Sequence, residues 1–64
     1  MCQVSAYIKS DEQQELVKEN VTRLEMLKNG LRISTLFEGA VDLEDMVVDH
    51  IDFTNGRLIL EKTG

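Results

Sequence analysis

Apolar and polar residues alternate over several short segments of the chain. The clearest is 31–37, where one side of the alternation consists of Leu31, Ile33, Thr35 and Phe37. In shorter examples the apolar side is formed by Val4 and Ala6, by Val47, Ile51 and Phe53, and by Leu58 and Leu60. Alternation with a period of two is typical of a half-buried β-strand. The pattern therefore predicts strands over residues 2–9, 31–37, 47–53 and 57–62.

Two Asn-Gly pairs separate these segments. Asn29-Gly30 follows the apolar stretch 21–27, and Asn55-Gly56 follows 47–53. Both central residues of a type I′ turn need a positive φ, which Asn and Gly accept more readily than other residues. We therefore expect two β-hairpins, each closed by a two-residue Asn-Gly turn.

Residues 10–27 fit two kinds of structure. They contain good helix formers, and Leu16, Val21 and Leu24 roughly follow a helical stripe that Gly30 could terminate. Strands are favoured because the Gly30 region leads directly into a predicted strand and because residues 11–14 could form a polar hairpin loop. The residues alone leave both structures open. Short strands at a spacing of about ten residues predict an all-β fold, a small barrel or a rolled antiparallel sheet of about six strands.

The length of the chain limits how much core it can build. It has 64 residues, of which 42% are hydrophobic, so we expect one domain over residues 1–64. A chain of this size buries only about 60% of the surface that its unfolded form exposes. Domains this small often gain stability from disulfides, a metal or a partner subunit. A single cysteine excludes an internal disulfide, which leaves a metal and dimerisation.

Charge and cysteine content indicate where the protein acts and which partners it avoids. The lone cysteine, the lack of a membrane-crossing apolar run and the lack of a signal-peptide pattern favour the cytoplasm. The net charge is −5, and the few lysines and arginines are scattered among acidic residues. Nucleic-acid binding depends largely on basic contacts to phosphate, so RNA, DNA and anionic membrane surfaces are disfavoured partners.

Cys2 has the most distinctive position in the sequence, directly after Met1. The Met1 amine, the Cys2 main-chain nitrogen and the Cys2 sulfur could together chelate one metal ion. If Met1 is removed, the amine and sulfur of Cys2 itself form the chelate. Square-planar coordination with nitrogen donors is typical of nickel(II) or copper(II), and a thiolate makes the site softer. Two such arms related by a two-fold axis would complete a plane of two nitrogens and two sulfurs, which links the metal to a homodimer.

The sequence as a whole resembles the CooT family, small nickel-binding accessory proteins associated with carbon monoxide dehydrogenase. The resemblance covers essentially the whole chain and depends on the order of its motifs more than on any one of them. These motifs are Met1-Cys2, Ala6-Tyr7, Glu15-Leu16, Val21, Leu36-Phe37-Glu38-Gly39, Val48, Ile51-Asp52 and Leu58-Ile59-Leu60-Glu61.

This resemblance implies a homodimeric, barrel-like β fold that binds about one Ni(II) per dimer, with Cys2 as the essential ligand and Met1 beside it. It implies a metallochaperone or nickel-storage role in maturation of a nickel enzyme, carbon monoxide dehydrogenase in the first place. The partners would be that enzyme or another nickel-handling accessory protein. It also favours strands over residues 10–27.

Other residues offer weaker candidates for metal binding. His50 is the only histidine, but it lies on the strand face opposite Ile51, which indicates a solvated position. An acidic group has no EF-hand spacing and is typical of a solvated face; it consists of Glu38, Asp42, Glu44, Asp45 and Asp49. Met26 and Met46 are expected to fill gaps in the core. Cys2 itself could be an ordinary buried thiol, because free cysteine is among the most buried residue types.

Two other functional classes compete with nickel handling. The chain has no nucleophile with a suggestively spaced base, so we do not expect an enzyme. A protein-interaction or assembly module without a metal would explain the size and acidity equally well. RNA binding, a label that some relatives carry, would need a basic face with exposed aromatic residues.

Overall fold

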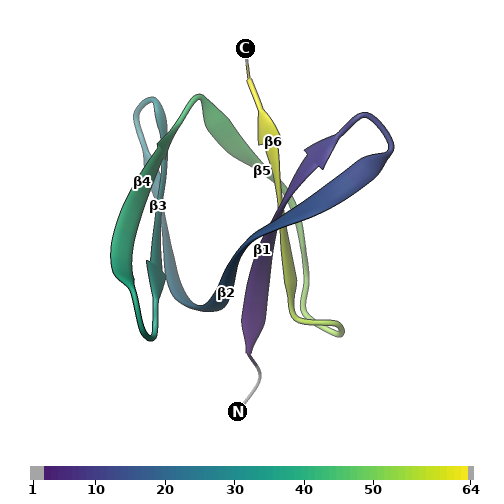
Figure 1. Ribbon diagram of the computed structural model, residues 1–64. Helices are drawn as coiled ribbons and strands as arrows, with labels where there is room; N and C mark the ends of the chain where they lie inside the picture. The colour runs from purple at the N-terminus through teal and green to yellow at the C-terminus, as the bar shows by residue number, and fades with distance from the viewer. Residues whose placement is uncertain (1–2, 64) are drawn as a thin grey trace.

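The computed structural model describes residues 3–63 and is all-β, as predicted; these residues contain no helix. Its six strands form one sheet in the order β4-β3-β2-β1-β6-β5 (Figure 1). The strands are β1 (Val4–Ser10), β2 (Gln13–Leu27), β3 (Gly30–Thr35), β4 (Gly39–Glu44), β5 (Met46–Asp52) and β6 (Arg57–Lys62).

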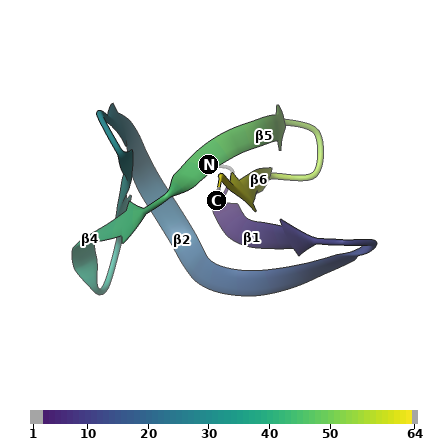
Figure 2. The same ribbon diagram turned by 90° about the horizontal axis from the view of Figure 1, so that it is seen from above.

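The sheet curls because one long strand, β2, belongs to both of its halves. The first part of β2 pairs with β1 and the second part with β3, and Val21 is paired with Val4 on one side and Thr35 on the other. Near this point Asn20 has a positive φ of 57°. The bend turns the sheet into a half-barrel, with β4 and β5 as the two ends of the strand order (Figure 2).

One neighbouring pair differs from the predicted antiparallel sheet. β1 and β6 run parallel, with Ala6 opposite Leu58 and Ile8 opposite Leu60, whereas the other four pairs are antiparallel. The sheet is therefore mixed. Alternation of apolar and polar residues marks the two faces of a strand but not its direction, so the sequence pattern could not distinguish the two arrangements.

Residues 10–27 form a hairpin end and a strand, which confirms the strand interpretation. Only Asp11 and Glu12 form the turn, and Gln13 already pairs with Ser10. Register shifts in β2 break the period of two. This explains why Val17, Val21 and Leu24, which all pack against the core, have a spacing that imitates a helix.

The first Asn-Gly hairpin is present, but its turn lies one residue earlier than predicted. Gly30 is already paired with Leu27 as the first residue of β3, so the two-residue connection is Lys28-Asn29. Position 30 needs a glycine for a steric reason and not because of a positive φ. A Cβ at this position would lie 2.1 Å from the carbonyl oxygen of Leu43, so only glycine permits β4 to approach.

The second Asn-Gly hairpin is also present, with a longer connection. Asp52 pairs with Arg57, and the four residues 53–56 form the loop. Gly56 has a φ of 65°, in the region that favours glycine. The prediction of a hairpin is confirmed, whereas the prediction of a two-residue turn is wrong, because Asp52 organises a wider loop.

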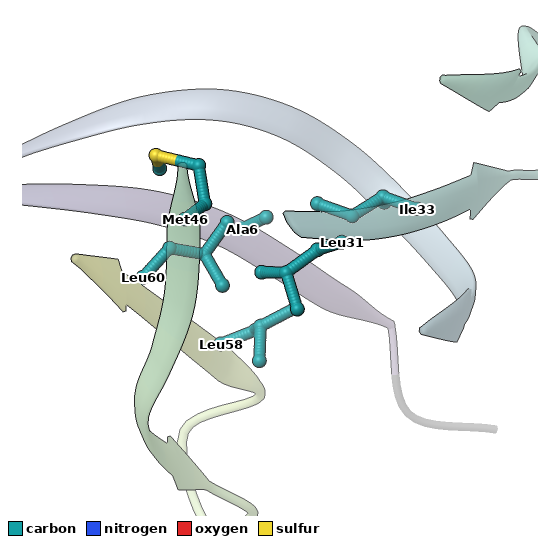
Figure 3. Close-up of a cluster of buried hydrophobic side chains, with 6 residues drawn as sticks. All are labelled: Ala6, Leu31, Ile33, Met46, Leu58 and Leu60. Atoms are coloured by element: carbon teal, nitrogen blue, oxygen red, sulfur yellow. The ribbon is translucent and has the colours of Figure 1, made fainter. Parts of the chain in front are cut away.

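The core lies inside the curl of the sheet. Buried apolar side chains come from the three neighbouring strands β1, β6 and β5 and from β3, which three strands separate from β5 in the sheet order. They meet because the half-barrel closes over them (Figure 3). The cluster consists of Ala6, Leu31, Ile33, Met46, Leu58 and Leu60.

The prediction of which residues face the core is only partly correct for two of the strands. Leu31, Ile33 and Thr35 are buried as predicted, but β3 ends at Thr35 and Phe37 lies in an exposed turn. In β5, a register shift between Val48 and His50 disturbs the alternation. The predicted inward residues of that segment are all exposed: Val47 alternates with the buried Met46, Ile51 lies near the end of the edge strand, and Phe53 lies in the loop after β5.

Candidate metal centre

The two residues predicted to hold a metal, Met1 and Cys2, lie outside the described residues. The chain can be followed from Gln3, which lies against the β5–β6 loop. The Ser5 amide donates a hydrogen bond to the Gly56 carbonyl oxygen at 2.9 Å. A Cβ on Gly56 would lie 2.5 Å from the Gln3 carbonyl oxygen. The glycine therefore lets the loop hold the start of β1 closely.

The strand register places Gln3 at the same end of the sheet as two exposed loops. One row of paired residues crosses the whole sheet at this level: Gly39, Thr35, Val21, Val4 and Ser5, Arg57 and Asp52. Directly beyond this row come Gln3, the turn 36–38 and the loop 53–56. Figure 1 shows the start of the chain and both loops at its lower edge.

Large apolar side chains are exposed at this end. Leu36 is 62% exposed, Phe37 79% and Phe53 80%. We use the name N-terminal end for this end of the sheet, where Gln3, Leu36, Phe37 and Phe53 lie. The alternating pattern missed it, because Phe37 and Phe53 were assigned to inward strand positions. The turn-forming residues 52–56 could have revealed it, because they indicate that the strand ends before Phe53.

Asp52 fixes the loop that carries Phe53. Its carboxylate accepts hydrogen bonds from the Thr54 amide at 3.0 Å, the Asn55 amide at 3.1 Å and the Asn55 side-chain amide at 2.7 Å. Hydrogen bonds to the ionised form favour that form. The bonds from Asn55 and Thr54 accordingly hold the pKa of Asp52 below its ordinary value of 3.8.

The Asp52→Asn variant is expected to lose part of the acid sensitivity of the fold, since Asp42 and Asp49 also have lowered pKa values. Because the folded-state pKa of Asp52 is lowered, its contribution to stability is present above pH 3.8 and is lost as the pH falls below that value. Urea midpoints measured from pH 6 down to pH 2.5 should show the variant less stable than the wild type at pH 6 and closer to it at low pH. If the urea midpoints of the two proteins changed in parallel with pH, this role of Asp52 would be contradicted.

The structure places His50 away from the N-terminal end. It pairs with Ile59, which in turn pairs with Tyr7. His50 is therefore level with Tyr7, which follows Gln3 by four residues along the chain. This corresponds to about 13 Å of extended strand. Its Nδ1 contacts the Asp49 carboxylate, and this contact, with Lys9 beside it, lowers the pKa of Asp49. His50 is exposed, which confirms the predicted solvated position.

Several carboxylates of the acidic group contact basic side chains of other strands. Glu38 lies 3.2 Å from Lys18, and Asp42 lies 2.7 Å from Arg32. The Arg32 guanidinium lowers the pKa of Asp42. Within residues 3–63 no group of three or more His, Cys, Asp or Glu side chains could hold a metal ion.

The two internal methionines have different environments. Met46 is buried in the core, as expected, whereas Met26 is exposed near the far end of β2. The prediction that Met26 fills a core gap is wrong, because it lies just before the β2–β3 turn. Among the described residues there is no helix that is long and apolar enough to cross a membrane.

Comparison with known proteins identifies the family. The sequence matches the family described as CO dehydrogenase accessory protein CooT over residues 1–61. The fold matches a crystal structure assigned as CooT from Carboxydothermus hydrogenoformans, with a TM-score of 0.87, 24% sequence identity, and coverage of 98% of this chain and 100% of that chain. No curated protein matches the sequence. The resemblance seen in the sequence is therefore confirmed, and the chain belongs to the CooT family of CO dehydrogenase accessory proteins.

Proposed function

We propose that this protein binds nickel as a homodimer and delivers or stores it for maturation of carbon monoxide dehydrogenase. Cys2 of each subunit would supply a sulfur ligand to a shared Ni(II), the cargo of the protein. The description of the family as a CO dehydrogenase accessory protein supports the recipient. The acidic net charge of −5 suits a cationic cargo.

The observation that carries this proposal is the apolar surface of the N-terminal end. Chain connectivity ties Cys2 to Gln3, which lies beside the exposed Phe53 loop. A two-fold contact uses the same patch on both subunits, so covering this surface with a second copy would bring two Cys2 residues to one seam. The two Phe53 side chains of a dimer could bury roughly 300–500 Å², about a quarter to two fifths of the roughly 1,200 Å² of a small specific interface.

The donor set suits a square-planar ion. Each subunit would offer the Cys2 sulfur together with nitrogen atoms of Met1 and Cys2, and two subunits would complete the coordination plane. Such donors favour nickel(II) or copper(II) over oxygen-preferring cations. Because thiolate and nitrogen donors must lose protons to bind, we expect nickel affinity to fall as the pH is lowered.

Replacing Phe53 with aspartate tests the seam. A charge in the centre of an apolar contact should weaken dimerisation by at least about 30-fold, the cost of losing one hot-spot residue. Sedimentation equilibrium should then show a monomer, and calorimetric titration should no longer give one nickel per two chains.

Met26→Asp is the matched control, because Met26 is 74% exposed but lies near the far end of β2. It should leave both the dimer and the nickel stoichiometry unchanged. A Phe53→Asp protein that remained dimeric and bound one nickel per two chains would refute this seam.

A further inference from the structure

The first part of β2 has a hydrogen-bonding edge that the described chain does not use. Residues 13–19 follow β1 on one side, while the Leu36 amide donates a hydrogen bond to the Asn20 carbonyl oxygen and β3 pairs with β2 from Val21 onward. Ser10 and Gln13 flank a two-residue turn and therefore form a hydrogen-bonded pair. Alternation along the ladder then directs the main-chain groups of Gln14 and Leu16 away from β1. Figures 1 and 2 show this hairpin projecting from the sheet.

A groove with a mixed polar and apolar lining lies beside this edge. It has a volume of about 420 Å³ and runs between β2 and the turn after β3. Leu16 and Val17 line one side and Phe37 the other, and both Leu16 and Phe37 are exposed. The Lys18–Glu38 ion pair, at 3.2 Å, joins the two walls.

The surroundings of the groove are acidic. The only lysine that lines it, Lys18, is already paired with a carboxylate. The carboxylates of the groove and of the adjoining hairpin are Asp11, Glu12, Glu15, Glu19 and Glu38. An occupant with basic side chains would therefore be attracted to this rim, whereas an acidic segment would be repelled.

We propose that the β2 edge binds an extended, basic segment of a partner protein as an added strand. The free main-chain groups of Gln14 and Leu16 would hold its backbone, the groove would take an apolar side chain, and the acidic rim would contact lysine or arginine. This is the strand-addition mode of peptide recognition.

The two other edges of the sheet are less suitable for strand addition. β4 has six residues, and β5 is interrupted by the register shift between Val48 and His50, whereas residues 13–16 of β2 pair with β1 without a shift. Short strands and bulges are features that protect edges from pairing. The β2 edge is the one accompanied by the Leu16–Phe37 groove.

A peptide that alternates lysine and valine is a suitable probe. Binding to the ¹⁵N-labelled full-length protein should shift the amide signals of Gln14 and Leu16 and slow their hydrogen exchange about fivefold, the factor that corresponds to one net hydrogen bond. The same peptide with glutamate in place of lysine should not bind.

Two variants separate the edge from the groove. Gln14→Pro removes an outward donor without removing a bond to β1, and proline is tolerated at such edge positions. Leu16→Lys removes the apolar contact and adds a repelling charge. Each should weaken peptide binding at least about tenfold, while Met26→Lys, an exposed position outside the groove, should not.

The result is independent of nickel, so Cys2→Ser should bind the peptide like the wild type even if it binds no metal. Three outcomes would overturn the proposal. They are shifts confined to β4 or β5, equal binding of the glutamate peptide, and protection of Gln14 and Leu16 that rises with protein concentration alone. The last outcome would assign the edge to a second copy.

Discussion

Replacing Cys2 with serine is expected to abolish stoichiometric nickel binding, with a loss of affinity of more than about 100-fold. Loss of a group that only supports a ligand already costs 10- to 100-fold in metal affinity, and Cys2→Ser removes the ligand itself. Serine keeps the size of the side chain but offers no thiolate at neutral pH. The fold should be unaffected, because residues of β1, β3, β5 and β6 already form the buried cluster.

Absorption spectroscopy during a nickel titration measures this effect directly. Wild-type protein should develop a thiolate-to-nickel charge-transfer band that saturates near one ion per two chains, and Cys2→Ser should show none. His50→Ala is the control, because His50 lies level with Tyr7 and away from Gln3. It should titrate like the wild type. Unchanged affinity in Cys2→Ser would exclude Cys2 as the ligand.

Truncating Ile33 to alanine should have the largest effect on the fold. Ile33 is fully buried, at 0% exposure, in the centre of β3. Losing its side chain should cost about 2–5 kcal/mol, from lost burial and from the cavity left behind. At roughly 0.05–0.15 kcal/mol per residue, a chain of 64 residues has little stability in reserve, so a measurable unfolded population is expected at room temperature.

Urea denaturation followed by circular dichroism can quantify this loss. Ile51→Ala deletes the same atoms at a position that is 39% exposed, on the edge strand β5. Its effect should be less than half of that of Ile33→Ala, because surface substitutions usually change stability by about 0.5 kcal/mol or less. Equal losses at the two positions would show that the curl of the sheet does not contain the core.

The strands could be predicted because burial on one face imposes alternation. Leu31, Ile33 and Thr35, and again Leu58 and Leu60, are buried in register with the pattern. The direction of β6 beside β1 could not be predicted in this way, since parallel and antiparallel neighbours bury the same face. The reason for glycine at position 30 could not be predicted either, because it depends on the backbone of Leu43, which belongs to another strand.

One part of the candidate site could be predicted from the sequence, and the other part only from the fold. Cys2 could be found from its position and from the family resemblance. The apolar surface of the N-terminal end could not, because it is assembled by register. Phe37 and Phe53 are 16 residues apart in the sequence numbering and come to the same end of the sheet as Gln3 only when the strands pair in this register.

The parallel pairing of β1 with β6 has a consequence for how the protein is made. A ribosome releases β1 first and β6 last, and β1 lies between β2 and β6 in the finished sheet. Nascent chains therefore hold an incomplete sheet, with Ala6 still lacking Leu58 opposite it, until synthesis is nearly finished. Contacts between the two ends of a chain form late because closing a long loop costs entropy. A chain truncated at the end of β5 would consequently lack the β5–β6 loop, whose Gly56 carbonyl oxygen accepts the hydrogen bond of the Ser5 amide at the start of β1.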